Sequence, residues 1–101
     1  MKKIEEIMCD AVENCKSRKI GNTEVKMYGD TCVVYLHGNA IWQQNGWQRK
    51  RNHCEFSLAG WNTATTRSRL RALGVDVTTK SFIPMCEGEQ ISENKWYVFK
   101  Y

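Results

Sequence analysis

The sequence predicts an α+β fold: a small antiparallel sheet packed by an N-terminal amphipathic helix, with a second short basic helix. Apolar residues near the N-terminus recur at helical spacing, and several later segments alternate apolar with polar residues as strands do. A threonine- and arginine-rich run that ends at Gly74 has the signature of a short helix. Because 101 residues cannot build two adequate cores, we expect one domain over 1–101.

The first helix is predicted over 4–18, within an N-terminal helical segment of 1–20. Acidic residues in its first turns and basic residues at its end match the helix dipole, and Gly21-Asn22 would end it. A stripe this continuous must pack on the chain's own sheet or on a second copy, so a homodimer stays open. Its apolar face consists of Ile4, Ile7, Met8, Ala11, Val12 and Cys15.

Residues 22–101 are expected to supply the sheet and the short helix. The segments 23–28 and 31–37 alternate as two strands joined by a tight turn at Gly29-Asp30. Alternation also predicts strands at 53–58, 77–83 and 95–101, whereas 38–52 is expected to be a loop or an irregular hairpin. The pattern leaves the strand order open.

The short basic helix is expected at about 63–73. Asn62 or Thr63 can cap its N-terminus through a side-chain oxygen, and Gly74 can end it in a left-handed conformation. Its apolar stripe is narrow, and Arg67 and Arg71 lie one turn apart on a shared face.

The positive charge is concentrated in the middle of the chain. The protein has a formal net charge of +4, but residues 49–71 alone hold six basic residues against Glu55. Such a block raises encounter rates with nucleic acid or with an acidic protein surface, without choosing between them.

The cysteines indicate reduced thiols. Five is an odd number and none forms a C-x-x-C pair, so neither a disulfide framework nor a zinc ribbon is indicated. Cys15, Cys32 and Cys54 fall where the local pattern expects core side chains, while Cys9 and Cys86 fall outside these patterns and could be exposed.

The sequence gives no indication of an enzyme, and we expect no catalytic residue, metal or cofactor. None of the glycine-flanked serine, H-E-x-x-H, phosphate-binding loop or paired-carboxylate motifs is present. A nucleophile pair of His37 and Cys54 is disfavoured because alternation already explains Cys54 as core. A metal site formed by His37, His53, Cys54 and Cys86 would match no recurrent ligand spacing.

Basic residues interleaved with aromatic residues give the strongest functional indication. Indole rings stack on bases or fill interface pockets, while guanidinium groups reach phosphates or carboxylates. Whether Trp42, Trp47 and Trp61 are core or surface stays open, because indoles of small domains are usually well buried. The predicted binding residues are Trp42, Trp47, Arg49, Lys50, Arg51, Arg67, Arg69 and Arg71.

We expect neither export nor membrane insertion. Acidic residues interrupt the N-terminal stretch where a signal peptide needs an apolar run, and no window holds the roughly 18 apolar residues of a span. Membranes are thus not expected as partners. The basic and aromatic block instead indicates a host protein or nucleoprotein complex with an acidic surface, or RNA or DNA.

Three segments carry a resemblance to a known family. The runs Asn22 to Val25, Val33 to Asn39 and Gly60 to Leu70 resemble a family of small tailed-bacteriophage proteins of unknown function with N-T-x-V, L-H-G-(N/T) and G-W-x-T-x-T-T-x-x-R-L patterns. By their physical chemistry the matching residues are expected to be largely structural: Gly60 frees the backbone, Trp61 fills the core and the threonines cap and enter the helix. The N-terminal helix and the 49–51 basic run are less typical of the pattern.

The resemblance implies an origin rather than an activity. By analogy, a small non-enzymatic phage protein is expected to work in the host cell cytoplasm during infection. There it would inhibit or redirect a host machine, such as a CRISPR-type defence complex or host nucleic-acid machinery. The alternative is an accessory protein that binds RNA or DNA directly.

Overall fold

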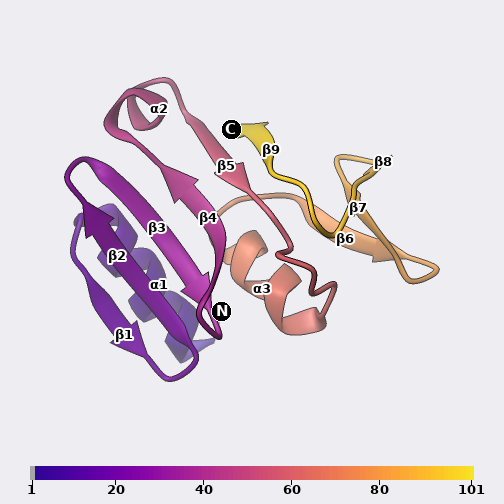
Figure 1. The fold of residues 1–101 in the computed structure, drawn as a ribbon, viewed down its shortest axis with the longest axis horizontal. Coiled ribbons are helices and arrows are strands. Elements are labelled where there is room, and N and C mark those ends of the chain that lie inside the picture. Colours follow the sequence, from indigo (N-terminus) through magenta and orange to yellow (C-terminus); the bar gives the residue numbers. More distant parts are fainter. Residues whose placement is uncertain (1) are drawn as a thin grey trace.

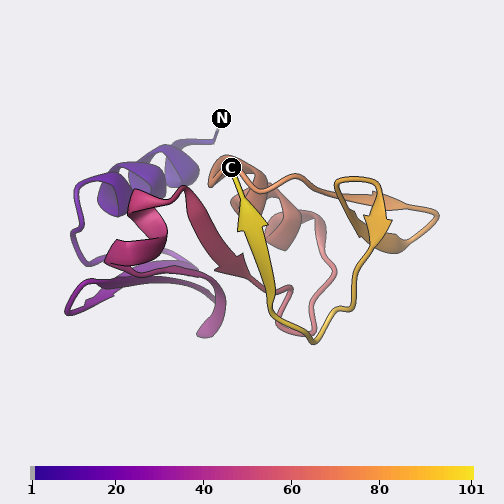
Figure 2. The ribbon, with the colours of Figure 1, turned by 90° about the horizontal axis from the view of Figure 1, so that it is seen from above.

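The computed structural model describes residues 2–101 and has an α+β architecture, as predicted (Figure 1). A six-stranded antiparallel sheet has the order β1-β2-β3-β4-β5-β9, and β6, β7 and β8 form a separate small sheet. Figure 2 shows α1 and α3 on one side of the large sheet. The elements are α1 (Lys3–Glu13), β1 (Arg18–Ile20), β2 (Thr23–Tyr28), β3 (Thr31–Leu36), β4 (Asn39–Gln44), α2 (Gly46–Lys50), β5 (His53–Phe56), α3 (Ala64–Ala72), β6 (Val77–Lys80), β7 (Ile83–Cys86), β8 (Glu89–Gln90) and β9 (Tyr97–Lys100).

The core lies between the large sheet and the two longer helices. Val25 and Val34 face each other across β2 and β3, and Trp42 follows on β4, paired in turn with Val34 and Phe56. All four side chains are buried, and Met8 of α1 packs over them. The N-terminal helix therefore packs its apolar face on the chain's own sheet.

The first helix is shorter than predicted, and Cys15 is exposed rather than buried. The helix ends in a pair of C-terminal bonds, Lys16 N to the Ala11 oxygen at 2.9 Å and Cys15 N to the Val12 oxygen at 3.2 Å. These bonds place Cys15 in the left-handed region at φ 53°. Residues 18–20, expected inside the helical segment, are instead the edge strand β1.

The hairpin of β2 and β3 is confirmed, but the expected loop at 38–52 is wrong. Most of that segment is the strand β4 followed by α2, and a register shift between Val34 and Tyr35 makes the β3–β4 pairing irregular. The bulge explains why neighbouring Ile41 and Trp42 are both buried, a pattern that simple alternation does not predict.

The second half also contains more strands than predicted. The short helix is confirmed as α3, with Thr63 as its N-cap and Gly74 at φ 90° after its end. The expected strand at 77–83 is two strands, β6 and β7, with a tight turn at Ser81 and Phe82. The strands expected at 53–58 and 95–101 are the shorter β5 and β9.

A buried ion pair joins α1, α3 and β2. Arg69 Nη1 lies 2.8 Å from Glu5 Oε2, and both side chains are 5% exposed. Ser68 donates a second bond to the same oxygen at 2.5 Å, and Arg69 Nε donates to the Thr23 hydroxyl at 3.1 Å. Burial opposes ionisation of Glu5, but the bonds from Ser68 and Arg69 and the charge of Arg69 prevail and lower its pKa.

The thiols fall into three environments. Cys32 and Cys54 are buried, as predicted, whereas Cys9 and Cys86 are half-buried rather than exposed. Cys9 donates to the Ala72 oxygen at 3.2 Å. Burial raises the pKa of Cys32 and of Cys86 to about 11, so both stay protonated at neutral pH.

Replacing one partner of the ion pair should destabilise the fold strongly. Glu5→Ala leaves the Arg69 charge buried and uncompensated, which costs about 3–5 kcal/mol of unfolding free energy. The double variant Glu5→Leu/Arg69→Met should recover most of that loss, because no charge remains buried. Urea unfolding measures both, and the exposed Glu6→Ala on the same helix should change stability by less than about 0.5 kcal/mol.

Acid should weaken the same linkage. Because the pKa of Glu5 is lower in the folded chain than its ordinary 4.5, the pair stabilises the fold above that value. The contribution is lost as the pH falls through the lower, folded-state pKa. Unfolding free energy measured from pH 6 down to pH 2 should therefore fall less steeply in Glu5→Gln than in the unmodified chain.

Thiol labelling should separate the cysteines. Exposed Cys15 should react with an alkylating reagent in the native protein at neutral pH before any other cysteine, because the others are buried or half-buried. Cys32 and Cys54 should react only on unfolding. Peptide mass mapping after a timed pulse identifies the order, and early labelling of Cys54 would contradict the packing of β5.

Candidate binding surfaces

The predicted basic residues do not form one free patch. Arg69 is buried in the ion pair, so its assignment to an accessible binding surface is wrong. Arg71 Nη1 donates to the Val77 oxygen at 3.0 Å, and Arg67 Nη1 donates to Asn62 Oδ1 at 2.5 Å and to its backbone oxygen at 3.1 Å. All three arginines of α3 thus use guanidinium donors within the protein.

Arg49 holds the end of α1. Its Nη2 donates to the Glu13 oxygen at 2.7 Å, and its Nη1 lies 2.7 Å from the Cys15 sulfur. The last carbonyls of a helix have no partner within the helix, so this guanidinium satisfies one of them from across the fold. The Arg49 side chain is exposed, and its hydrogen bond to the Glu13 oxygen joins α2 to α1.

Trp42 is core, which removes it from the predicted binding set. Its side chain is 2% exposed, and its indole nitrogen donates to the Tyr101 hydroxyl at 3.3 Å. That hydroxyl donates onward to the Leu73 oxygen at 2.7 Å. The chain of bonds ties β4, the C-terminal strand and the end of α3 together.

The remaining predicted residues gather on and beside α2. Trp47 is 58% exposed, and the Arg51 guanidinium lies 4.8 Å above its ring, within cation–π range. His53 meets the same indole edge-on, with ring centroids 6.2 Å apart. Lys50 is exposed on the same helical turn. We call these four residues, Trp47, Lys50, Arg51 and His53, the α2 cluster.

The short helix that carries the α2 cluster is held by a capping box and by contacts to β5 and to the β2–β3 turn. Asn45 Oδ1 accepts from Gln48 N at 2.8 Å while Gln48 Oε1 accepts from Asn45 N at 2.9 Å, a capping box. Gln48 also donates to Glu55 of β5 at 2.9 Å. At Gly46 a Cβ atom would lie 2.9 Å from Asp30 Oδ2, so glycine permits this close approach. The cluster is therefore displayed on a rigid support.

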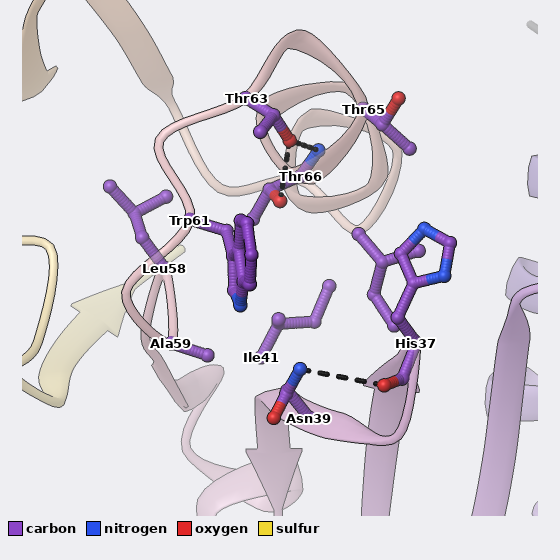
Figure 3. Close-up of a pocket in the computed structure, with 10 residues that line it drawn as sticks. His37, Asn39, Ile41, Leu58, Ala59, Trp61, Thr63, Thr65 and Thr66 are labelled. Carbon is purple, nitrogen blue, oxygen red and sulfur yellow. Dashed lines mark hydrogen bonds between the residues drawn. The ribbon is translucent and has the colours of Figure 1, made fainter.

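A pocket opens between the β3–β4 turn and the N-terminus of α3. It has a volume of about 510 Å³, and its lining includes the buried apolar side chains of Leu36, Ile41 and Leu58. Figure 3 shows the Trp61 indole and the His37 imidazole on opposite sides, with Ile41 between them at the base. We call this cavity the Trp61 pocket. The rest of its lining consists of Asn39, Ala59, Thr63, Thr65 and Thr66.

Trp61 is a wall of this pocket and not a core residue, so the expectation that it fills the core is wrong. Its side chain is 60% exposed, and it follows Ala59 and Gly60, which both have positive φ. Thr63 Oγ1 accepts from Thr66 N at 3.2 Å and caps α3, as predicted. The runs Leu36 to Asn39 and Trp61 to Thr66, far apart in sequence, meet here.

The chemistry of the Trp61 pocket suits recognition of an apolar or aromatic group. Its base is apolar, and no Asp, Glu, Lys or Arg lines it. Hydroxyl and amide groups at the rim can orient a ligand. The Thr63 and Thr66 hydroxyls lie 2.9 Å apart and bond each other.

The cysteine and histidine candidates for chemistry lie in separate environments. Cys54 is fully buried, and burial raises its thiol pKa although Tyr101 and Trp42 bond to it. His37 is exposed at the β3–β4 turn. Within residues 2–101 no three His, Cys, Asp or Glu side chains lie together as a metal site would require.

Sequence reasoning missed the Trp61 pocket and the tip of the β6–β7 hairpin. Phe82 at that tip is 95% exposed, and alternation gave no sign of it because it lies in the turn. The pocket had a signal, since His37, Asn39 and Trp61 belong to the runs that carry the resemblance. Each run taken separately predicts only structural roles for these residues, because the pocket exists only where the runs meet in the fold.

The fold and its accessible side chains define a small α+β protein with aromatic and cationic surface features. The chain belongs to the Kyanoviridae Gp96 protein family, a family of phage proteins whose model matches residues 1–100. No curated protein and no solved structure matches the chain significantly. None of the described helices is long and apolar enough to cross a membrane.

Proposed function

We propose that this phage protein is a non-enzymatic binding protein that inhibits or redirects a host machine by docking on an acidic protein surface. The α2 cluster carries the proposal, because it joins an exposed indole to two cationic side chains on a rigid turn. Tryptophan and arginine are the residue types that dominate binding energy at protein interfaces. A host protein or nucleoprotein complex, such as a defence complex, is the expected partner.

The arrangement of cations favours a protein partner over nucleic acid. Duplex or single-stranded binding needs many cations free to neutralise phosphates. Here Arg49, Arg67, Arg69 and Arg71 donate hydrogen bonds inside the protein, which leaves Lys50 and Arg51 as the exposed pair of the predicted block whose side chains donate none among the described residues. Two cations beside one indole suit a compact acidic patch.

Direct binding of RNA or DNA is the second candidate. The exposure of Trp47 and of Trp61 favours it, because exposed indoles stack on unpaired bases. In that case affinity for a single-stranded oligonucleotide should fall log-linearly with salt and collapse when Lys50 and Arg51 become alanine.

The proposal is tested by capture of a host complex from infected-cell lysate. The variant Trp47→Ala/Arg51→Ala should capture at least tenfold less of the host complex than the unmodified chain does, because it lacks the indole and the charge stacked on it. The matched control is Lys26→Ala, since Lys26 lies 5.9 Å over the Tyr35 ring in a second cation–aromatic pair. Quantitative mass spectrometry of the eluates measures the ratio.

Equal capture by the unmodified chain and the α2 variant would refute the proposed docking surface. So would equal loss in the Lys26 control. A gel shift with single-stranded RNA at low salt, abolished in Lys50→Ala/Arg51→Ala, would instead establish the nucleic-acid candidate.

A further inference from the structure

The β6–β7 hairpin presents a large apolar side chain to solvent. Phe82 is 95% exposed, and its neighbour Ile83 is 41% exposed. A fully exposed phenylalanine contributes nothing to the core of its own chain, and it lies at the end of the molecule where the hairpin projects (Figures 1 and 2). Together with Ile83 it forms a small contiguous apolar feature, and contiguous exposed apolar surface is typical of interaction sites.

The backbone of the turn adds a second observation. Ser81 and Phe82 both have positive φ, 50° and 67°, as the two central residues of a type I′ hairpin turn require. Glycine or asparagine takes such angles with little strain, whereas a bulky side chain does so at a cost. The sequence therefore places an aromatic ring where the turn itself would favour glycine.

The Trp61 pocket lies beside this tip. Asn62, the residue after Trp61, donates from Nδ2 to the Phe82 oxygen at 3.2 Å, and Arg67 holds Asn62 in turn. The bond fixes the hairpin against the pocket rim through its backbone, while the Phe82 ring stays exposed. The apolar projection is thus tied to the residue that follows Trp61, one wall of the apolar pocket.

We propose that the chain forms a two-fold homodimer in which Phe82 of each copy inserts into the Trp61 pocket of the other. A surface that carries a projection and its matching pocket side by side is self-complementary, as a two-fold interface requires. The pocket has room for one aromatic ring, and its lining holds no charged Asp, Glu, Lys or Arg. An inserted ring would therefore meet no Asp, Glu, Lys or Arg side chain of the lining, although the chain has a net charge of +4.

The expected dimer is weak and reversible. Two phenylalanine and two tryptophan rings supply at most about 1,000 Å² of buried area, the lower end for specific interfaces. An interface of that size is typical of weak, transient association, so the dimer is expected only at micromolar or higher concentrations. The α2 cluster lies at the other end of the molecule (Figures 1 and 2), so both copies would keep theirs free to bind. This inference does not depend on the function proposed for that cluster.

Sedimentation equilibrium from 5 to 500 µM tests the proposal. The unmodified chain should approach twice the monomer mass and no more, and Phe82→Gly should weaken association by about 30-fold or more. Phe82→Gly should not lower the melting temperature at 5 µM, because relief of the left-handed backbone offsets the freedom that glycine gains on unfolding. The control Tyr28→Ala removes another aromatic side chain, 52% exposed, and should dimerise normally.

A mixing experiment tests the reciprocal contact. Thr65→Arg places a charged side chain at the pocket rim and should abolish self-association while keeping Phe82. When Thr65→Arg and Phe82→Gly are mixed, one of the two contacts can form, so the mixture should associate more than either variant alone. An unmodified chain that stays monomeric at 500 µM would overturn the proposal. Dimerisation unchanged in Phe82→Gly, or a mass that grows beyond the dimer, would do the same.

Discussion

The buried contact between Glu5 and Arg69 is the constraint on which the rest of the fold depends. It joins the first helix to α3 and, through Thr23, to the sheet. Two charges removed from water stabilise a structure only when each is fully bonded, and here Ser68 and Asn22 contribute further bonds to the pair. No buried side-chain nitrogen or oxygen is left without a partner among the described residues.

That contact also positions the features that face solvent. Arg69 bonds α3 to Glu5 of α1 and to Thr23 of β2, and the N-terminus of the same helix lines the Trp61 pocket together with the β3–β4 turn. Away from this pocket, Arg49 bonds α2 to the end of α1 and so holds the helix that carries Trp47, the residue on which Arg51 stacks. Arginines that looked like parts of a binding surface thus hold that surface in place.

Much of the fold was predictable because its signals are local. The β2–β3 hairpin follows from alternation around Gly29-Asp30, and α3 follows from a threonine cap and a closing glycine. The predictions failed where a bulge or a tight turn interrupts the alternation of apolar and polar residues along a strand. The bulge before Tyr35 buries two successive residues of β4, and the tight turn at Ser81 divides one expected strand into two.

The sequence by itself determined the α+β class, the central hairpin, the short helix and the burial of Cys32 and Cys54, because these follow from the spacing of neighbouring residues. Only the tertiary structure decided which cations and indoles are accessible. Arg69 is buried because a carboxylate 64 positions away meets it, and Trp61 is an exposed wall of a pocket whose lining also comes from the β3–β4 turn. A periodic pattern reports which face of an element is apolar, but the partner of a charged or aromatic side chain is set by segments that meet only in the folded chain.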